Sequence, residues 1–289
     1  MAILRNGILT VEVNSHGAEL QSIEKNGTEY LWQGDKDYWG RRSPVLFPIV
    51  GSVWEGRYRI DGKEYLLGQH GFARDMDFTL VSASDTEVRY RLESSEQTKE
   101  KYPYDFCLEI AYRIHGSCLD VIWEVKNPSE EEVWFQIGAH PAFFYPDYDA
   151  RNPGRGSMTF DRNDIECIRI KGKGCVDAQT KWPLDLSDGR LKLEKDTFDA
   201  IDTIMIQDSQ ISRVNMFRED GSPWLSLSFD APVVGIWSPP GKNAPFICIE
   251  PWYGRCDRYG YEGDYRHKDW MNRIAAGETF SAMYTIEIA

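Results

Sequence analysis

Apolar and polar residues alternate along much of this chain. Leu9, Val11 and Val13, for example, are separated by the polar residues Thr10 and Glu12. The same period of two recurs in the segments 88–92, 108–114, 119–125, 225–229 and 280–288. A period of two with one apolar face is typical of half-buried antiparallel strands. The sequence therefore predicts a mainly β protein.

Turn signals separate these segments. Asn26-Gly27, Asp61-Gly62 and Asp220-Gly221 are dipeptides typical of tight turns between strands. The segment 117–138 indicates a hairpin in which residues 127–132 form the turn.

Helical periodicity is scarce. Short helical turns are expected only around 94–101 and 194–200, and no long amphipathic helix is found. The chain has 289 residues, of which 42% are hydrophobic, which is enough for a sizeable core. Because no linker or low-complexity segment interrupts it, we expect one domain over residues 1–289.

The negative net charge of the chain argues against two classes of binding partner. The formal net charge is −13 and no run of basic residues occurs, so we expect binding neither to nucleic acid nor to an anionic membrane surface. No uninterrupted apolar run approaches the roughly 18 residues of a membrane-spanning helix. Residues 1–17 also lack the continuous apolar stretch of a secretory signal. We therefore expect a cytoplasmic protein.

The cysteines do not form a metal or redox motif. They lie at positions 107, 118, 167, 175, 248 and 256, with no Cys-x-x-Cys pair. We expect reduced, mostly buried thiols. Cys248 is flanked by Ile247 and Ile249, which indicates a core residue rather than a nucleophile.

Three segments break the alternation by placing polar groups beside aromatic, glycine and proline residues. They are 69–74, 138–144 and 248–254. His140 precedes Pro141, which restricts it to extended geometry, so we expect it at the end of a strand. Glu250 likewise follows an apolar run, where a carboxylate is costly unless it is paired or hydrogen-bonded. Each residue taken alone is also compatible with a structural role in the core.

Four segments together resemble the aldose 1-epimerase (galactose mutarotase-like) superfamily, and its LacX-type branch in particular. They are RRSPVLFPIVG at 41–51, HGFAR at 70–74, IGAHPAF at 137–143 and IEPWYG at 249–254. They occur in the family's order, and the resemblance spans essentially the whole chain. It implies a large antiparallel β-sandwich, the galactose mutarotase-like supersandwich, with a cleft on one sheet.

The resemblance also implies roles for single residues. The family's proton-donating histidine corresponds to His140 and its catalytic glutamate to Glu250. The expected substrate-binding residues are His70, Arg42, Arg74, Asp202 and Trp252, with Arg41 as the alternative to Arg42 and Asp199 as the alternative to Asp202. The galactose-specific branch has an asparagine-bearing motif where this chain has LFPIVG, so the sugar itself stays open.

These residues predict an isomerase that interconverts the α and β anomers of a free hexose. Ring opening needs a base at the C1 hydroxyl and an acid at the ring oxygen. We assign Glu250 as the base and His140 as the acid, and a nearby carboxylate is expected to favour the charged imidazolium. Trp252 and Phe143 are expected to pack on the sugar. The assembly is expected to be a monomer or a homodimer.

Several alternatives remain at this stage. A hexose-6-phosphate mutarotase would use Arg41, Arg42 and Arg74 at a phosphate. A non-catalytic carbohydrate-binding protein would keep the aromatic residues and Arg42 but would not need both His140 and Glu250. A glycoside hydrolase would pair Glu250 with Asp202 or Asp257.

Cofactors are not expected. Ring opening by acid and base requires neither a metal nor a nucleotide, and the sequence has no glycine-rich phosphate loop and no metal-ligand spacing. The one metal site considered would combine His70, His140 and Glu250 as two imidazoles and a carboxylate.

Overall fold

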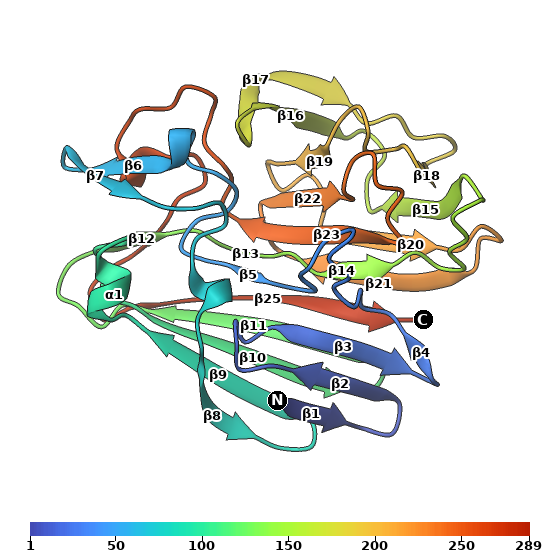
Figure 1. Ribbon diagram of the computed structural model, residues 1–289, viewed down its shortest axis with the longest axis horizontal. Helices are drawn as coiled ribbons and strands as arrows, with labels where there is room; N and C mark the ends of the chain where they lie inside the picture. Colours follow the sequence, from blue (N-terminus) through green and yellow to red (C-terminus); the bar gives the residue numbers. More distant parts are fainter.

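The computed structural model describes all 289 residues, and antiparallel strands dominate it (Figure 1). The prediction of a mainly β protein is confirmed. Two large sheets and one smaller sheet form the sandwich, and two short two-stranded sheets flank them.

A nine-stranded sheet runs through the molecule, with the strand order β18-β15-β20-β21-β25-β11-β10-β9-β8. Its strands in chain order are β8 (Thr79–Ala83), β9 (Glu87–Glu93), β10 (Cys107–His115), β11 (Cys118–Lys126), β15 (Gly154–Phe160), β18 (Leu191–Glu194), β20 (Arg213–Phe217), β21 (Pro223–Phe229) and β25 (Thr279–Ile288).

An eight-stranded sheet contains Glu250 and Trp252, two of the residues singled out in the sequence. Seven strands follow the order β17-β16-β19-β22-β23-β13-β5, and β14 also pairs with β23. Their bounds are β5 (Val45–Leu46), β13 (Ile137–Ala139), β14 (Ala142–Phe144), β16 (Glu166–Gly172), β17 (Cys175–Pro183), β19 (Thr203–Ile206), β22 (Val233–Trp237) and β23 (Phe246–Tyr253).

The remaining elements are short. The four-stranded sheet contains β1 (Ala2–Arg5), β2 (Leu9–Val13), β3 (Leu20–Lys25) and β4 (Thr28–Glu29), and the two-stranded pairs are β6 (Arg57–Ile60) with β7 (Lys63–Leu66) and β12 (Val133–Phe135) with β24 (Asn272–Ile274). The helical pieces are α1 (Glu96–Lys99) and the 3₁₀ turns η1 (Trp54–Gly56), η2 (Ala73–Asp75) and η3 (Tyr265–His267).

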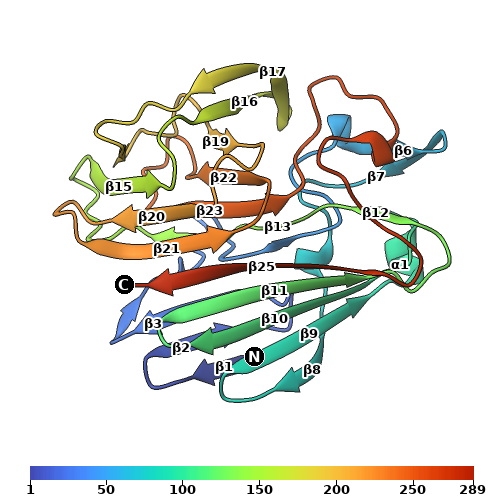
Figure 2. The same cartoon turned by 180° about the vertical axis from the view of Figure 1, so that it is seen from behind.

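The layers explain the alternation along the strands. In Figure 1 the four-stranded sheet lies over one end of the nine-stranded sheet and the eight-stranded sheet over the other, and Figure 2 shows the nine-stranded sheet from behind. The main hydrophobic core contains 65 buried residues and extends from Leu4 to Ile288. The apolar side chains of successive strands therefore face one shared interior.

Two local predictions need correction. The segment 117–138 is not a hairpin, because β11 pairs with β10 and β25 whereas β12 pairs with β24. Alternation shows which face of a strand is buried but not which strand lies beside it. The Asn127 side chain donates hydrogen bonds to the carbonyls of Ile274 and Ala275, which holds the start of this connection against the chain near β24. Of the two expected helical turns, α1 forms, but residues 195–200 form non-helical turns.

The six cysteines are all free, and four of them are buried. No helix of this protein is long and apolar enough to span a membrane.

Candidate functional site

Strand β23 supplies the floor and one functional group of a cavity. Side chains of a strand alternate between its faces, so Glu250 and Trp252 point to the same side. The indole of Trp252 lies flat over the sheet because Gly138 on β13 and Gly235 on β22 have no side chain. A Cβ at Gly138 would lie 2.6 Å from Trp252 Cδ1, and one at Gly235 would lie 2.5 Å from Cη2.

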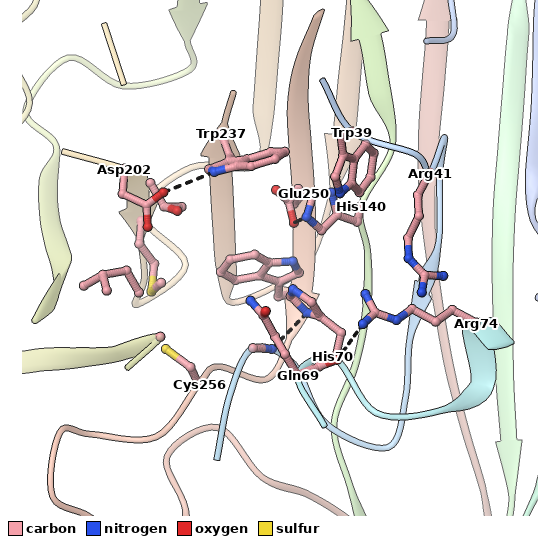
Figure 3. A pocket seen from close by; sticks show the side chains of 16 residues that line it. Trp39, Arg41, Gln69, His70, Arg74, His140, Asp202, Trp237, Glu250 and Cys256 are labelled. Atoms are coloured by element: carbon pink, nitrogen blue, oxygen red, sulfur yellow. Dashed lines mark hydrogen bonds and ion pairs between the residues drawn. The ribbon is translucent and has the colours of Figure 1, made fainter. Parts of the chain in front are cut away.

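The cavity over this floor has a volume of about 410 Å³, within the usual range for small-molecule sites. Figure 3 shows its lining side chains. Those that matter below are Trp39, Arg41, Gln69, His70, Arg74, His140, Asp202, Trp237, Glu250, Trp252 and Cys256. Of the residues expected from the sequence, His140, Glu250, His70, Arg74, Asp202 and Trp252 are brought together here.

His140 and Glu250 are in direct contact. Residue 140 follows β13, and Glu250 lies in the neighbouring strand β23, so the two side chains meet over the sheet. His140 Nε2 lies 3.3 Å from Glu250 Oε2, and the side chains are only 10% and 2% exposed. Glu250 Oε2 and His140 Nδ1 nevertheless have no hydrogen-bond partner within the protein.

The ionisation of this pair differs from the expected carboxylate and imidazolium. Burial lowers the pKa of His140 to about 3, and the nearby Arg74 guanidinium acts in the same direction. Burial also raises the pKa of Glu250 well above its usual value, although the neighbouring Trp252 side chain opposes this shift. The low-dielectric surroundings penalise both charges, so burial favours neutral groups that hold one titratable proton between them.

His70 is held by a strained loop. Its backbone φ is +65°, and that of Gly71 is +71°. A Cβ at Gly71 would lie 2.1 Å from the carbonyl oxygen of Phe47, so only glycine fits there. The His70 amide donates to the carbonyl of Gly51 at 2.8 Å, which ties the segment 47–51 to this histidine.

The same loop fixes the tautomer of His70. The amide of Gly51 donates to His70 Nδ1 at 3.1 Å. Burial lowers the pKa of His70 well below its usual value, and His140 and Arg74 act in the same direction. A neutral ring that accepts at Nδ1 carries its hydrogen on Nε2. His70 is therefore a hydrogen-bond donor rather than an acid.

Two arginines line the cavity, and they are not the pair expected first. Arg41 Nη2 donates to Asp75 Oδ1 at 2.8 Å, and Arg74 Nη2 donates to the carbonyl of Gln69 at 2.7 Å. Arg42 instead donates to the carbonyl of Gln21 and is absent from the lining. The chain bends at residues 42 and 43, and Arg41 alone of the two neighbours lines the cavity.

Asp202 reaches the cavity from the turn before β19, and its φ is +58°. Trp237 Nε1 donates to Asp202 Oδ1 at 3.2 Å, and burial raises the pKa of this carboxyl despite that hydrogen bond. Asp199 accepts a hydrogen bond from the Gly241 amide and does not line the cavity. Asp257 is engaged by buried Lys268, also outside the lining.

The aromatic walls were only partly predictable. Trp39 stacks on His140 with ring centroids 4.7 Å apart, and Trp237 meets the same imidazole edge to face. Nothing in the local pattern singles out Trp237, whereas Trp39 lies two residues before Arg41 in an irregular aromatic stretch. Phe143 is fully buried in the main core and does not face the cavity. Strand alternation in β14 directs it towards the other sheet.

One group of potential metal ligands is present. Donor atoms of His140, Cys248 and Glu250 all lie within 4.8 Å of one another. His70 is not part of this group, so the combination considered from the sequence is not the one that the fold assembles.

Known proteins resemble this chain along essentially its whole length. The sequence matches the family profile described as aldose 1-epimerase over residues 2–285. It is 30% identical over 298 aligned positions to the protein LacX, chromosomal, of Lactococcus lactis subsp. lactis, covering 99% of this chain and 98% of that protein.

Two solved structures share the fold. The galactose mutarotase related enzyme from Lactobacillus acidophilus superposes with a TM-score of 0.92 at 30% identity, covering 100% of this chain and 97% of that one. A galactose mutarotase-like protein from Lactobacillus casei ATCC 334 gives a TM-score of 0.92 at 28% identity, with both chains covered fully. The galactose mutarotase-like sandwich and the matched profile agree, and we conclude that this chain belongs to the aldose 1-epimerase family.

Proposed function

We propose that this protein is a mutarotase that interconverts the α and β anomers of a free hexose. The observation that carries the proposal is the 3.3 Å contact between His140 Nε2 and Glu250 Oε2 in the wall of a cavity of about 410 Å³. The anomeric hydroxyl and the ring oxygen are bonded to the same carbon. The acid and the base that act on them must therefore be neighbours.

The single proton of the pair supports a balanced ring opening. When the sugar enters, its anomeric hydroxyl donates to Glu250 and stabilises the carboxylate, and the shared proton passes to His140. Glu250 then removes the proton from the C1 hydroxyl while His140 protonates the ring oxygen, the C1–O5 bond breaks and the aldehyde forms. Glu250 is now protonated and His140 neutral, which is the state that burial favours. Rotation about C1–C2 and reversal of the steps give the other anomer.

The remaining residues hold the substrate. His70 offers its Nε2 hydrogen, Asp202 accepts from a hydroxyl, and the flat indole of Trp252 packs against an apolar face of the sugar. Both His70 and Asp202 occupy positive φ, a strained arrangement that often marks binding sites.

The test is direct. Fresh α-glucose and α-galactose are followed by polarimetry or by NMR anomer exchange with and without the protein. We expect equilibration above the spontaneous rate for at least one sugar. Saturable binding without faster exchange would instead identify a carbohydrate-binding protein.

A hexose 6-phosphate is the second candidate substrate. Figure 3 shows Arg41 and Arg74 on the side of the catalytic pair opposite Asp202. If His140 faces the ring oxygen, that side receives the C6 substituent, because C5 is bonded to the ring oxygen. Arg74 Nε is buried without a hydrogen-bond partner, and burial together with Arg41 lowers the pKa of Arg74 to about 10. An anionic group would relieve both conditions.

A comparison of catalytic efficiencies distinguishes the two candidate substrates. Glucose and glucose 6-phosphate are compared for kcat/KM in the unmodified protein and in Arg74→Gln. If glucose 6-phosphate is the substrate, Arg74→Gln loses far more activity on glucose 6-phosphate than on glucose. An equal loss on both sugars contradicts the phosphorylated substrate and leaves the free hexose.

A further inference from the structure

We propose that His140, Cys248 and Glu250 form a binding site for Zn²⁺, and that an ion bound there switches the catalytic pair off. The inference uses a thiol that the proposed reaction does not need. Its spectroscopic test is independent of the proposed function, because it requires no turnover.

The strand geometry brings the three donors together. Cys248 and Glu250 are two residues apart on β23 and therefore point to the same face. Ala142 pairs with Cys248 in the adjacent strand β14, so the chain that carries His140 runs beside these two residues. One donor atom from each side chain lies within 4.8 Å of the others.

Two polar atoms of these side chains have no hydrogen-bond partner within the protein. His140 Nδ1 and Glu250 Oε2 are buried without any hydrogen-bond partner, although their side chains are at least nine-tenths buried. Buried polar atoms are rarely left unpaired. The Cys248 thiol lies within 4.8 Å of one donor atom of each of these two side chains.

The chemistry of the set selects Zn²⁺ rather than a hard cation. Imidazole, thiolate and carboxylate are the ligands of zinc sites, at bond lengths of about 2.0–2.3 Å. Donor atoms within 4.8 Å of one another are near enough for side-chain rotation to bring them onto one ion. The Cys248 thiol and the catalytic pair release their protons to solvent on binding.

The position of the site makes it inhibitory. His140 and Glu250 line the substrate cavity, whereas Cys248 is fully buried and does not. An ion held by all three occupies the proton-transfer groups and leaves its fourth coordination position towards the cavity. A substitution of Cys248 should therefore weaken Zn²⁺ binding without removing a group that the proposed reaction uses.

The activity test compares the unmodified enzyme with Cys248→Ala and Cys248→Ser. We expect Zn²⁺ to inhibit the unmodified enzyme, and EDTA to restore its activity. Both variants should keep near-normal activity without metal and bind Zn²⁺ at least about tenfold more weakly, the lower end of what second-sphere changes already cost at zinc sites. Cys256→Ala, which alters the other thiol near the cavity, should keep the inhibition constant of the unmodified enzyme.

The binding test uses Co²⁺ as a spectroscopic substitute. We expect a thiolate-to-cobalt charge-transfer band in the unmodified protein and in Cys256→Ala, and no such band in the Cys248 variants. Equal Zn²⁺ inhibition of the Cys248→Ala enzyme overturns the proposal. So does bound Co²⁺ without a thiolate band in the unmodified protein, a result that does not depend on whether any variant folds.

Discussion

At the scale of single residues, the cavity is defined by groups whose charges are suppressed by burial. Glu250 is 1% exposed and His140 8% exposed, yet each lacks a complete set of hydrogen bonds. The pKa of the carboxyl is raised and that of the imidazole is lowered. The pair therefore holds one proton over a wide range of pH, and that proton is what an acid and a base acting together require.

This proton count predicts how the pair changes stability with pH. In the unfolded chain the two groups titrate at their ordinary values of 4.5 and 6.5, so between these values they also hold one proton. Their contribution to stability is then flat. Below pH 4.5 the unfolded pair binds a second proton. In the folded protein His140 does not bind this proton until the pH reaches about 3, so the free energy of unfolding decreases as the pH falls. Above pH 6.5 the unfolded pair loses its last proton while the raised pKa of Glu250 retains it in the folded state, so stability falls again.

Urea unfolding from pH 3 to 9 checks this expectation. The reference is the double variant His140→Asn/Glu250→Gln, and the free energy of unfolding of the variant is subtracted from that of the unmodified protein at each pH. The difference should have a plateau between the two ordinary pKa values, with slopes of at most about 1.4 kcal/mol per pH unit outside it. A difference that rises steadily with pH contradicts the shared proton.

Catalysis gives the second prediction at this scale. Glu250→Gln and His140→Ala each remove one proton-transfer group, and we expect kcat to fall by about two to four orders of magnitude, the usual scale for general acid–base groups. Asp199→Asn, outside the cavity, is the control and should keep its activity. Full activity in either catalytic variant refutes the role assigned to that residue.

At the scale of elements, β23 and its neighbours work as one platform. Gly138 on β13 and Gly235 on β22 flank the indole of Trp252, so the floor of the cavity depends on the absence of two side chains. The hydrogen bond from Trp252 Nε1 to the carbonyl of Ala139, at 3.2 Å, fixes the ring in this orientation. A single strand thus positions both the floor of the cavity and the Glu250 carboxyl group.

Gly235→Ala tests this platform. The new Cβ would lie 2.5 Å from Trp252 Cη2, so the indole must rotate into the cavity. We expect a loss of stability of about 1–3 kcal/mol, the usual cost of overpacking, together with a raised KM for the sugar. Gly68→Ala is the matched control, since nothing lies within 4 Å of a Cβ there. Denaturant unfolding and steady-state kinetics measure both; unchanged values in Gly235→Ala would show that the floor adapts.

At the scale of the whole molecule, distant parts of the chain are interleaved. The nine-stranded sheet places β25 between β11 and β21, and the eight-stranded sheet places β23 beside β13 and β14. The main core likewise extends from Leu4 to Ile288. On this basis we propose that residues 1–289 form one domain, because the main core and both large sheets combine segments from distant parts of the chain.

Calorimetry tests the single domain. We expect one unfolding transition whose calorimetric and van't Hoff enthalpies agree, since the sheets and the core are shared along the chain. Two separable transitions, or a calorimetric enthalpy well above the van't Hoff value, would divide the molecule into independent units.

The sequence by itself determined the β character of this protein and much of its site. Side-chain period is a local property, so the alternation in 9–13 or 280–288 predicts strands without knowledge of their partners. Motif resemblance indicated the family and singled out His140, Glu250 and His70, which line one cavity in the structure. Pairing across the sheets is not local, and only the tertiary structure showed that β12 joins β24 rather than β11.

The direction of side chains and the state of their protons were also decided by the fold. Arg41 rather than Arg42 faces the cavity, and Asp202 rather than Asp199 does so, because backbone geometry chooses between near neighbours. Trp237 joins the site through β22, far along the chain from its neighbours in space. The residue types alone suggest a charged pair. Burial, which depends on every layer around the pair, instead lowers the pKa of His140 and raises that of Glu250, so both side chains are neutral.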